Sequence, residues 1–150
     1  LEIWPILLTT VEAALHDYPD LTVSFSGYRG GKASLLYLVL RKKINAKGFI
    51  PPYFRATMAG DIDSRLDKLV QGLGVINGKS GKFYPKSAVP KGTKIVDEWR
   101  GKKIQIESGA IDGVPRATWL DSGEVPMQLL SRWYGFSFTF PGCEIYGIRS

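Results

Sequence analysis

The sequence predicts an α+β protein, in which a helical N-terminal part precedes a small antiparallel β module made of hairpins and one helix. Three features predict this class. Apolar residues recur at helical spacing over residues 32–47, whereas they alternate with polar residues over residues 93–107. Residues 74–92, between the two patterns, are rich in Gly, Lys, Ser and Pro and poor in apolar residues. The change of period therefore indicates a change of architecture.

These three segments give the expected domain organisation. Residues 1–75 form a helix-rich region of no assigned type, residues 76–92 a linker-like loop, and residues 93–150 a β-hairpin-rich module. A chain of 150 residues suits one domain or two very small ones.

The helices of the first region follow from apolar spacing and end signals. Residues 4–17 are expected to form the first helix, and Thr9 or Thr10 could equally cap a shorter version of it. A short strand over 21–25 and a glycine-rich turn lead to the clearest helix, residues 32–47. Asp61 is expected to cap a further helix that continues to residue 73.

Turn residues and period-two alternation predict the elements of the β module. Arg100-Gly101 is typical of a two-residue hairpin turn between two strands. Asp121-Ser122 can cap a helix, and the alternating phenylalanines that follow it indicate a strand. The expected elements are strands over 93–99, 102–107 and 114–120, a helix over 123–134, and strands over 136–140 and 144–148.

Charge is distributed unevenly along the chain, which has a formal net charge of +6. Residues 29–60 contain seven basic side chains and no acidic one, and residues 81–105 contain seven basic and two acidic side chains. If both blocks fold onto one face, the protein presents a one-sided positive field that suits an anionic partner such as nucleic acid. The alternative is two solvated basic faces on different sides of the molecule.

Residue counts exclude several kinds of site. Cys143 is the only cysteine, so no intrachain disulfide is possible, and with His16 as the only histidine a structural zinc is not expected. No apolar run approaches the roughly 18 residues of a membrane span. No signal peptide is recognisable, so we expect an intracellular protein without membrane contact. No pair of carboxylates stands out for acid–base chemistry, and we expect no catalytic residue, cofactor or metal.

The loop from Gly27 to Ser34 suits a phosphate group, because it follows an expected strand and opens an expected helix. Gly30-Gly31-Lys32 and Ser34 resemble the Ser-Gly-Gly-Lys-Asp-Ser loop of the PP-loop ATP pyrophosphatases, which implies nucleotide binding. Arg29 and Ala33 depart from that pattern, and the parallel β/α units that follow the loop in that family are missing here. A turn into a helix is therefore the preferred interpretation, and a nucleotide-binding enzyme is an alternative.

Residues 90–150 resemble a known family. The stretch from Gly92 to Val96, followed by Glu98-Trp99-Arg100-Gly101-Lys102, resembles the opening of a phage- and prophage-associated family of unknown function. That family is similar to the RAMA domains, which are proposed to bind modified DNA. Asp112-Gly113 and Tyr146-Gly147-Ile148 match the turn and the closing segment, whereas Pro141-Gly142-Cys143 departs from the usual close. The resemblance implies a small β-rich module in a DNA-associated protein.

The function expected from the sequence is non-catalytic binding of nucleic acid, DNA before RNA, in a protein of phage, mobile-element or defence type. Its alternative is a structural or interaction subunit of a larger assembly or ribonucleoprotein, with protein partners. Arg132 and Tyr134 are the candidates for base contact. The basic side chains expected to contact phosphate are Arg41, Lys42, Lys43, Lys47, Arg55, Lys94, Arg100, Lys102 and Lys103.

Overall fold

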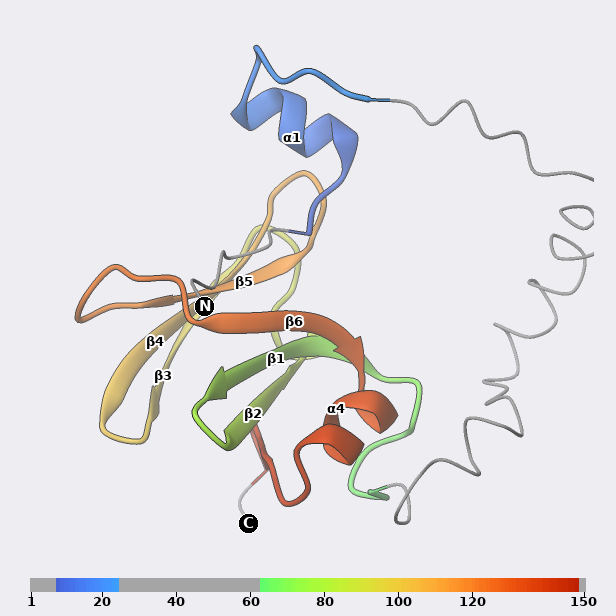
Figure 1. Ribbon diagram of the computed structural model, residues 1–150, viewed down its shortest axis with the longest axis vertical. Coiled ribbons are helices and arrows are strands. Elements are labelled where there is room, and N and C mark those ends of the chain that lie inside the picture. Colours follow the sequence, from blue (N-terminus) through green and yellow to red (C-terminus); the bar gives the residue numbers. More distant parts are fainter. Residues whose placement is uncertain (1–7, 25–62, 149–150) are drawn as a thin grey trace, which may run out of the picture. The chain divides into compact units, whose positions relative to one another are not determined.

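The computed structural model describes residues 8–24 and 63–148 (Figure 1). The chain divides into two compact units, of which one comprises Leu1–Pro19 together with Ile62–Ser150 and the other Asp20–Asp61. The described part of the first unit contains two α-helices and seven strands in two sheets, which confirms the α+β class. The helix expected over 32–47 and the loop from Gly27 to Ser34 lie outside the described residues.

Helix α1, Val11–Asp17, is the shorter version of the first expected helix. Thr10 is its N-cap, and the threonine Oγ1 accepts a hydrogen bond from the backbone N–H of Ala13 at 3.2 Å. This bond satisfies one of the N–H groups that a helix start leaves without an intrahelical partner. Of the two alternative caps, Thr10 is therefore the one used.

Four strands form the first sheet, in the order β6-β1-β2-β7. Strands β1, Gln71–Asn77, and β2, Ser80–Pro85, make an antiparallel hairpin whose turn holds Gly78 at a φ of 62°. Strand β6, Met127–Arg132, pairs antiparallel with β1, and the short β7, Glu144–Ile145, pairs parallel with β2.

Three strands form the second sheet, in the order β3-β4-β5. They are β3, Lys94–Trp99, β4, Lys102–Ser108, and β5, Pro115–Trp119, and both pairings are antiparallel. Arg100 and Gly101 turn the chain between β3 and β4 with φ values of 54° and 72°. Two positive φ values are typical of a type I′ turn, so the predicted hairpin is confirmed with its turn.

The first sheet has a hydrophobic core on each of its faces. One core fills the space between the two sheets, and the other lies between the first sheet and helix α4, Trp133–Thr139 (Figure 1). The first core contains Leu73, Val75, Tyr84, Val89, Trp99, Ile104, Ile106, Ala117 and Trp119. The second contains Ile76, Phe83, Trp133, Phe136, Cys143 and Ile145.

Two glycines of β1 lie where neighbouring groups leave no space for a side chain. A Cβ atom added at Gly74 would overlap the ring of Phe136 from α4, and one added at Gly72 would overlap the ring of Phe83. The ring of Phe136 also stacks at a tilt on Phe83, with centroids 5.5 Å apart. A side chain at Gly74 would therefore push the helix off the sheet, and one at Gly72 would displace Phe83 of the neighbouring strand β2.

The structure corrects four expectations for residues 63–148, and residues 21–24 do not form the strand expected over 21–25. Residues 63–70 form turns and residues 71–77 form β1, so the helix expected up to residue 73 is wrong. The loop expected over 76–92 contains β2 and the 3-10 helix η1, Lys86–Ala88. The other two errors lie after residue 120. Strand β6 forms where a helix was expected, and helix α4 forms where a strand was expected. In each case long-range strand pairing or packing on the sheet overrides the local pattern.

Neither helix of the described ranges, α1 or α4, has the length and apolar character of a membrane span.

A charged cleft between the two sheets as candidate functional site

The two sheets meet differently on their two sides. On one side, the side chain of Gln128 from β6 bridges to β5, because its Oε1 accepts a hydrogen bond from the N–H of Ala117 at 2.7 Å. Its Nε2 donates to the carbonyl of the same residue at 3.4 Å. On the other side, side chains from β2 and β7 meet side chains from β3 across a cleft. We call this second side the seam.

An ion pair crosses the seam from β2 to β3. Lys82 is 8% exposed, and its Nζ lies 2.6 Å from Oδ2 of Asp97. The hydroxyl of Tyr84 donates to the same carboxylate oxygen at 2.9 Å. Because residues two apart in a strand share a face, Lys82 and Tyr84 both point from β2 toward the second sheet. Asp97 therefore receives two partners from one strand.

A second bond crosses the seam from β3 to β7. The indole Nε1 of Trp99 donates to Oε1 of Glu144 at 2.7 Å. Glu144 is the register partner of Lys82 in the parallel β2–β7 pair, so the two side chains are neighbours on one face of the first sheet. We call Lys82, Tyr84, Asp97, Trp99 and Glu144 the seam cluster.

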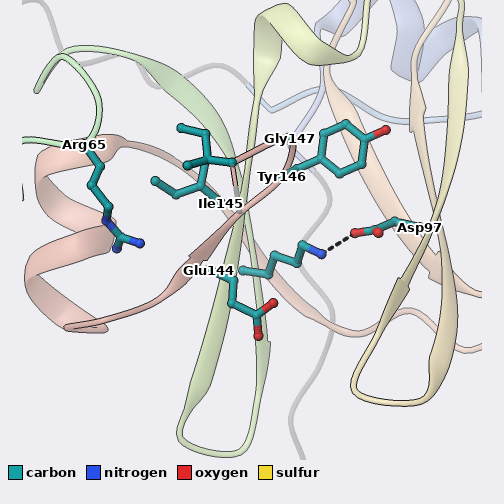
Figure 2. A pocket seen from close by; sticks show the side chains of 8 residues that line it. Arg65, Asp97, Glu144, Ile145, Tyr146 and Gly147 are labelled. Atoms are coloured by element: carbon teal, nitrogen blue, oxygen red, sulfur yellow. Dashed lines mark ion pairs between the residues drawn. The ribbon is translucent and has the colours of Figure 1, made fainter. Parts of the chain in front are cut away.

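Three residues of the seam cluster, Lys82, Asp97 and Glu144, line a cleft of about 530 Å³. The cleft is bounded by Arg65, by Lys82 and Asp97, and by the segment from Glu144 to Ile148 (Figure 2). A volume of this size is within the range of small-molecule sites in proteins, roughly 300–1,000 Å³. The aromatic wall is Tyr146, whose ring stacks on Tyr84 with centroids 5.5 Å apart.

Arg65 is held in place by bonds outside the seam cluster. Its Nε and one terminal nitrogen donate to the carboxylate of Asp63 at 2.9 and 2.7 Å, and that nitrogen also donates to the carbonyl of Cys143 at 2.8 Å. Its guanidinium lies 5.5 Å from the centroid of the Trp133 ring. The hydrogen bond from Arg65 lowers the pKa of Asp63, so this pair is ionised at neutral pH.

The environment of Tyr84 suits binding better than proton transfer. Burial raises the pKa of its hydroxyl far above the ordinary value, and the carboxylates of Asp97 and Glu144 raise it further. Tyr84 is thus a neutral hydrogen-bond donor across the physiological pH range. A general acid or base works best with a pKa near the operating pH, and Tyr84 does not meet that condition.

The structure brings together three of the predicted nucleic-acid contacts. Arg100, Lys102 and Lys103 lie in or beside the β3–β4 turn, and all three are exposed. The Nζ of Lys102 lies 5.6 Å from the centroid of the Trp119 ring. None of the three forms an ion pair with a residue of the described part of the chain. We call these three residues the turn cluster.

The other residues predicted to contact nucleic acid either lie away from the turn cluster or fall outside the residues that the structure describes. Lys94 lies at the far end of β3, opposite Glu107 in the β3–β4 register. Arg132 ends β6 and Tyr134 lies in the first turn of α4, and both are half-buried. The predicted contacts outside the described residues are Arg41, Lys42, Lys43, Lys47 and Arg55.

Acidic and basic side chains are equal in number among residues 8–24 and 63–148. The net charge of +6 therefore comes from residues outside these ranges. Cross-strand neighbours show the balance locally, because Lys103 lies opposite Glu98 and Arg116 opposite Glu107. The basic block of residues 81–105 is thus partly neutralised where it folds, and the turn cluster is its most concentrated part.

Sequence reasoning missed the seam cluster. A usable signal was present in β3, where Ile95, Asp97 and Trp99 share one face and the acid interrupts an otherwise apolar set. An acidic residue on the apolar face of a strand predicts a buried partner, since a buried charge is costly when unpaired. That partner, Lys82, lay in a segment that the sequence pattern assigned to a loop.

The described residues contain no group of three or more His, Cys, Asp or Glu side chains that could hold a metal ion. Comparison of the chain with protein-family models, with curated proteins and with solved structures found no match.

Proposed function

We propose that this protein is a non-catalytic nucleic-acid-binding module, with DNA as the preferred partner, and that the turn cluster contacts phosphate groups. The observation that carries the proposal is the exposure of Arg100, Lys102 and Lys103 at one turn, without acidic ion-pair partners in the described part of the chain. Guanidinium and ammonium groups in this state are available to displace counterions from a phosphate backbone.

The rigidity of the turn supports the same proposal. Two adjacent residues with positive φ and a two-residue connection hold Arg100 and Lys102 close to the ends of two paired strands. Below them, Trp99 and Trp119 stack at an interplanar angle of 14° with centroids 6.3 Å apart. The turn conformation and the packing of the two tryptophans therefore fix the backbone that carries the turn cluster.

Two further parts of the proposal depend on the sequence alone. We include Arg41, Lys42, Lys43, Lys47 and Arg55, on the helical N-terminal part that the apolar spacing predicts, because they carry much of the net positive charge. We also include a role in a phage, mobile element or defence system, which rests on the resemblance of residues 90–150 to the family of unknown function related to the RAMA domains. Arg132 and Tyr134 stay candidates for base contact, and Lys94 for phosphate contact.

The test is binding to labelled double-stranded DNA, single-stranded DNA and RNA at about 50 and 200 mM salt. We expect duplex DNA to bind best and its affinity to fall steeply between the two salt concentrations. Changing Arg100, Lys102 and Lys103 to Gln should weaken binding and flatten the slope of log affinity against log salt by about three, which is the number of contacts removed.

A matched control changes Lys79, Lys86 and Lys91 to Gln, because these lysines are also exposed and the net charge falls by the same amount. The control should keep most of the salt slope. Absence of binding to all three nucleic acids at the lower salt would overturn the proposed function. An equal loss in both triple variants would show non-specific attraction and would remove the turn cluster from the site.

A further inference from the structure

The cleft at the seam contains one carboxylate, that of Glu144, that forms no ion pair with a cation of residues 8–24 and 63–148. Among the described residues, Lys82 is paired with Asp97 and Arg65 with Asp63. Glu144 has neither as an ion-pair partner, and its Oε1 accepts a hydrogen bond from the neutral indole of Trp99. A half-buried carboxylate without a cation is costly, because it loses hydration without gaining a charged partner.

The cleft walls beside Glu144 are aromatic and aliphatic. Tyr146 and Ile145 line the cleft (Figure 2), as does Ile148. The ring of Tyr146 is fixed by stacking on Tyr84. The face of an aromatic ring attracts cations, and aliphatic walls favour the methylene groups of an alkyl chain. The carboxylate of Glu144 and the walls of the cleft thus suit the same kind of ligand, a cation at the end of a short hydrocarbon chain.

We propose that the cleft at the seam binds a primary ammonium or guanidinium group, with Glu144 as its counter-ion and Tyr146 as its aromatic wall. A lysine or arginine side chain of a peptide and a free alkylamine carry the same chemistry. An anionic ligand is disfavoured, because the carboxylates of Asp97 and Glu144 both line the cleft and both cations beside them are already paired. The inference is independent of nucleic-acid binding at the turn cluster.

Trp99 provides a reporter at the site, because its indole N–H is bonded to Glu144. The experiment is a titration of ¹⁵N-labelled protein with blocked lysine, N-acetyl-lysine methylamide, while the Trp99 indole resonance is followed by NMR. Blocked arginine and putrescine are the second and third probes, and blocked glutamine is the neutral control. We expect a saturable shift with the three cations and none with glutamine at the same concentration. Tighter binding of the blocked amino acids than of putrescine would identify a peptide side chain as the ligand. Tighter binding of putrescine would identify a free amine.

Two variants test the assignment of residues. Glu144→Gln keeps an oxygen that accepts the Trp99 bond but removes the charge, so binding of blocked lysine should weaken roughly tenfold or more. Tyr146→Leu should weaken it as well without changing the charge. The control, Glu124→Gln, removes an equal charge from an exposed turn and should bind as the unaltered protein does. Equal shifts with glutamine and lysine, or equal losses in Glu124→Gln and Glu144→Gln, would overturn the proposal.

Discussion

The ammonium of Lys82 lies 2.6 Å from the carboxylate of Asp97, and this ion pair joins β2 to β3 where the described strands share no backbone ladder. Their side chains are only 10% and 16% exposed. Two charges so far removed from water are stable only while both are present. The pair therefore ties the integrity of the seam to two residues.

Asp97→Asn is expected to destabilise the protein by about 3 kcal/mol, because it leaves the buried ammonium of Lys82 without a counter-charge. The double variant Lys82→Met with Asp97→Asn should recover much of that loss, since no unpaired charge remains. Urea unfolding followed by tryptophan fluorescence measures both. Glu98→Gln, on the exposed face of the same strand, is the control and should change stability by less than about 0.5 kcal/mol. A single variant as stable as this control would contradict the prediction.

Two glycine substitutions should have opposite effects. Gly74→Ala places a Cβ on the ring of Phe136 and should destabilise the protein by about 1–3 kcal/mol, the range for overpacked cores. Gly135→Ala, in α4, meets no atom within 4 Å in the described structure and should stabilise it by about 0.5 kcal/mol through the better helix propensity of alanine. Thermal unfolding of the two variants gives the comparison, and a shift of the same sign in both would contradict it.

Local signals in the sequence predicted the second sheet. The turn at Arg100-Gly101 needs only its own residues to form, and Ile104 and Ile106 alternate with polar neighbours, so both strands of this hairpin were predicted within a residue or two. Thr10 was one of the two alternative caps predicted for a shorter first helix, and it bonds to a residue three positions away. Where the determinant is local, reasoning from one sequence succeeds.

The first sheet depends on partners that are distant in sequence. Gly74 has the properties of a helix-ending residue until Phe136 is known to pack on it. Phe136 alternates with polar residues as in a strand until β1 and β2 supply a face for a helix. Strand β6 pairs with β1 across more than fifty residues. The seam cluster could not be predicted for the same reason, because Lys82 and Glu144 become neighbours only through the parallel β2–β7 pair.

Asp112 accepts a hydrogen bond from Thr9, just before helix α1, and this residue should make the stability of the fold depend on pH in the acid range. Asp112, whose side chain is 1% exposed, accepts hydrogen bonds from the hydroxyl of Thr9 at 2.6 Å, from the N–H of Val114 and from Arg116. Burial works to raise the pKa of Asp112, but the two hydrogen bonds and the charge of Arg116 together lower it below its ordinary value. The ionised carboxylate therefore stabilises the folded state at neutral pH.

The sign of the pH dependence follows from the lowered pKa of Asp112. Stability should be full above the unfolded value of about 4 and should fall as the pH drops from there through the folded value. Asp112→Asn should be less stable at pH 7 and should show a shallower loss below pH 4. Melting temperature against pH measures both, and the exposed Glu124→Gln is the control. A variant whose loss on acidification matched that of the unaltered protein would exclude Asp112 as a cause.

Cys143 should be slow to react while the protein is folded. It is 4% exposed, and burial raises the pKa of its thiol to about 11, although the charge of Arg65 pulls the value down. At pH 8 the reactive thiolate is then scarcer by roughly two orders of magnitude than in an unfolded chain, where the pKa is about 8.5. Reaction with a thiol-specific disulfide reagent at pH 8 should be at least a hundredfold slower in the native protein than in urea. Cys143→Ser gives the blank because the chain has no other thiol, and equal rates in the two conditions would mean that this side of the second core opens freely.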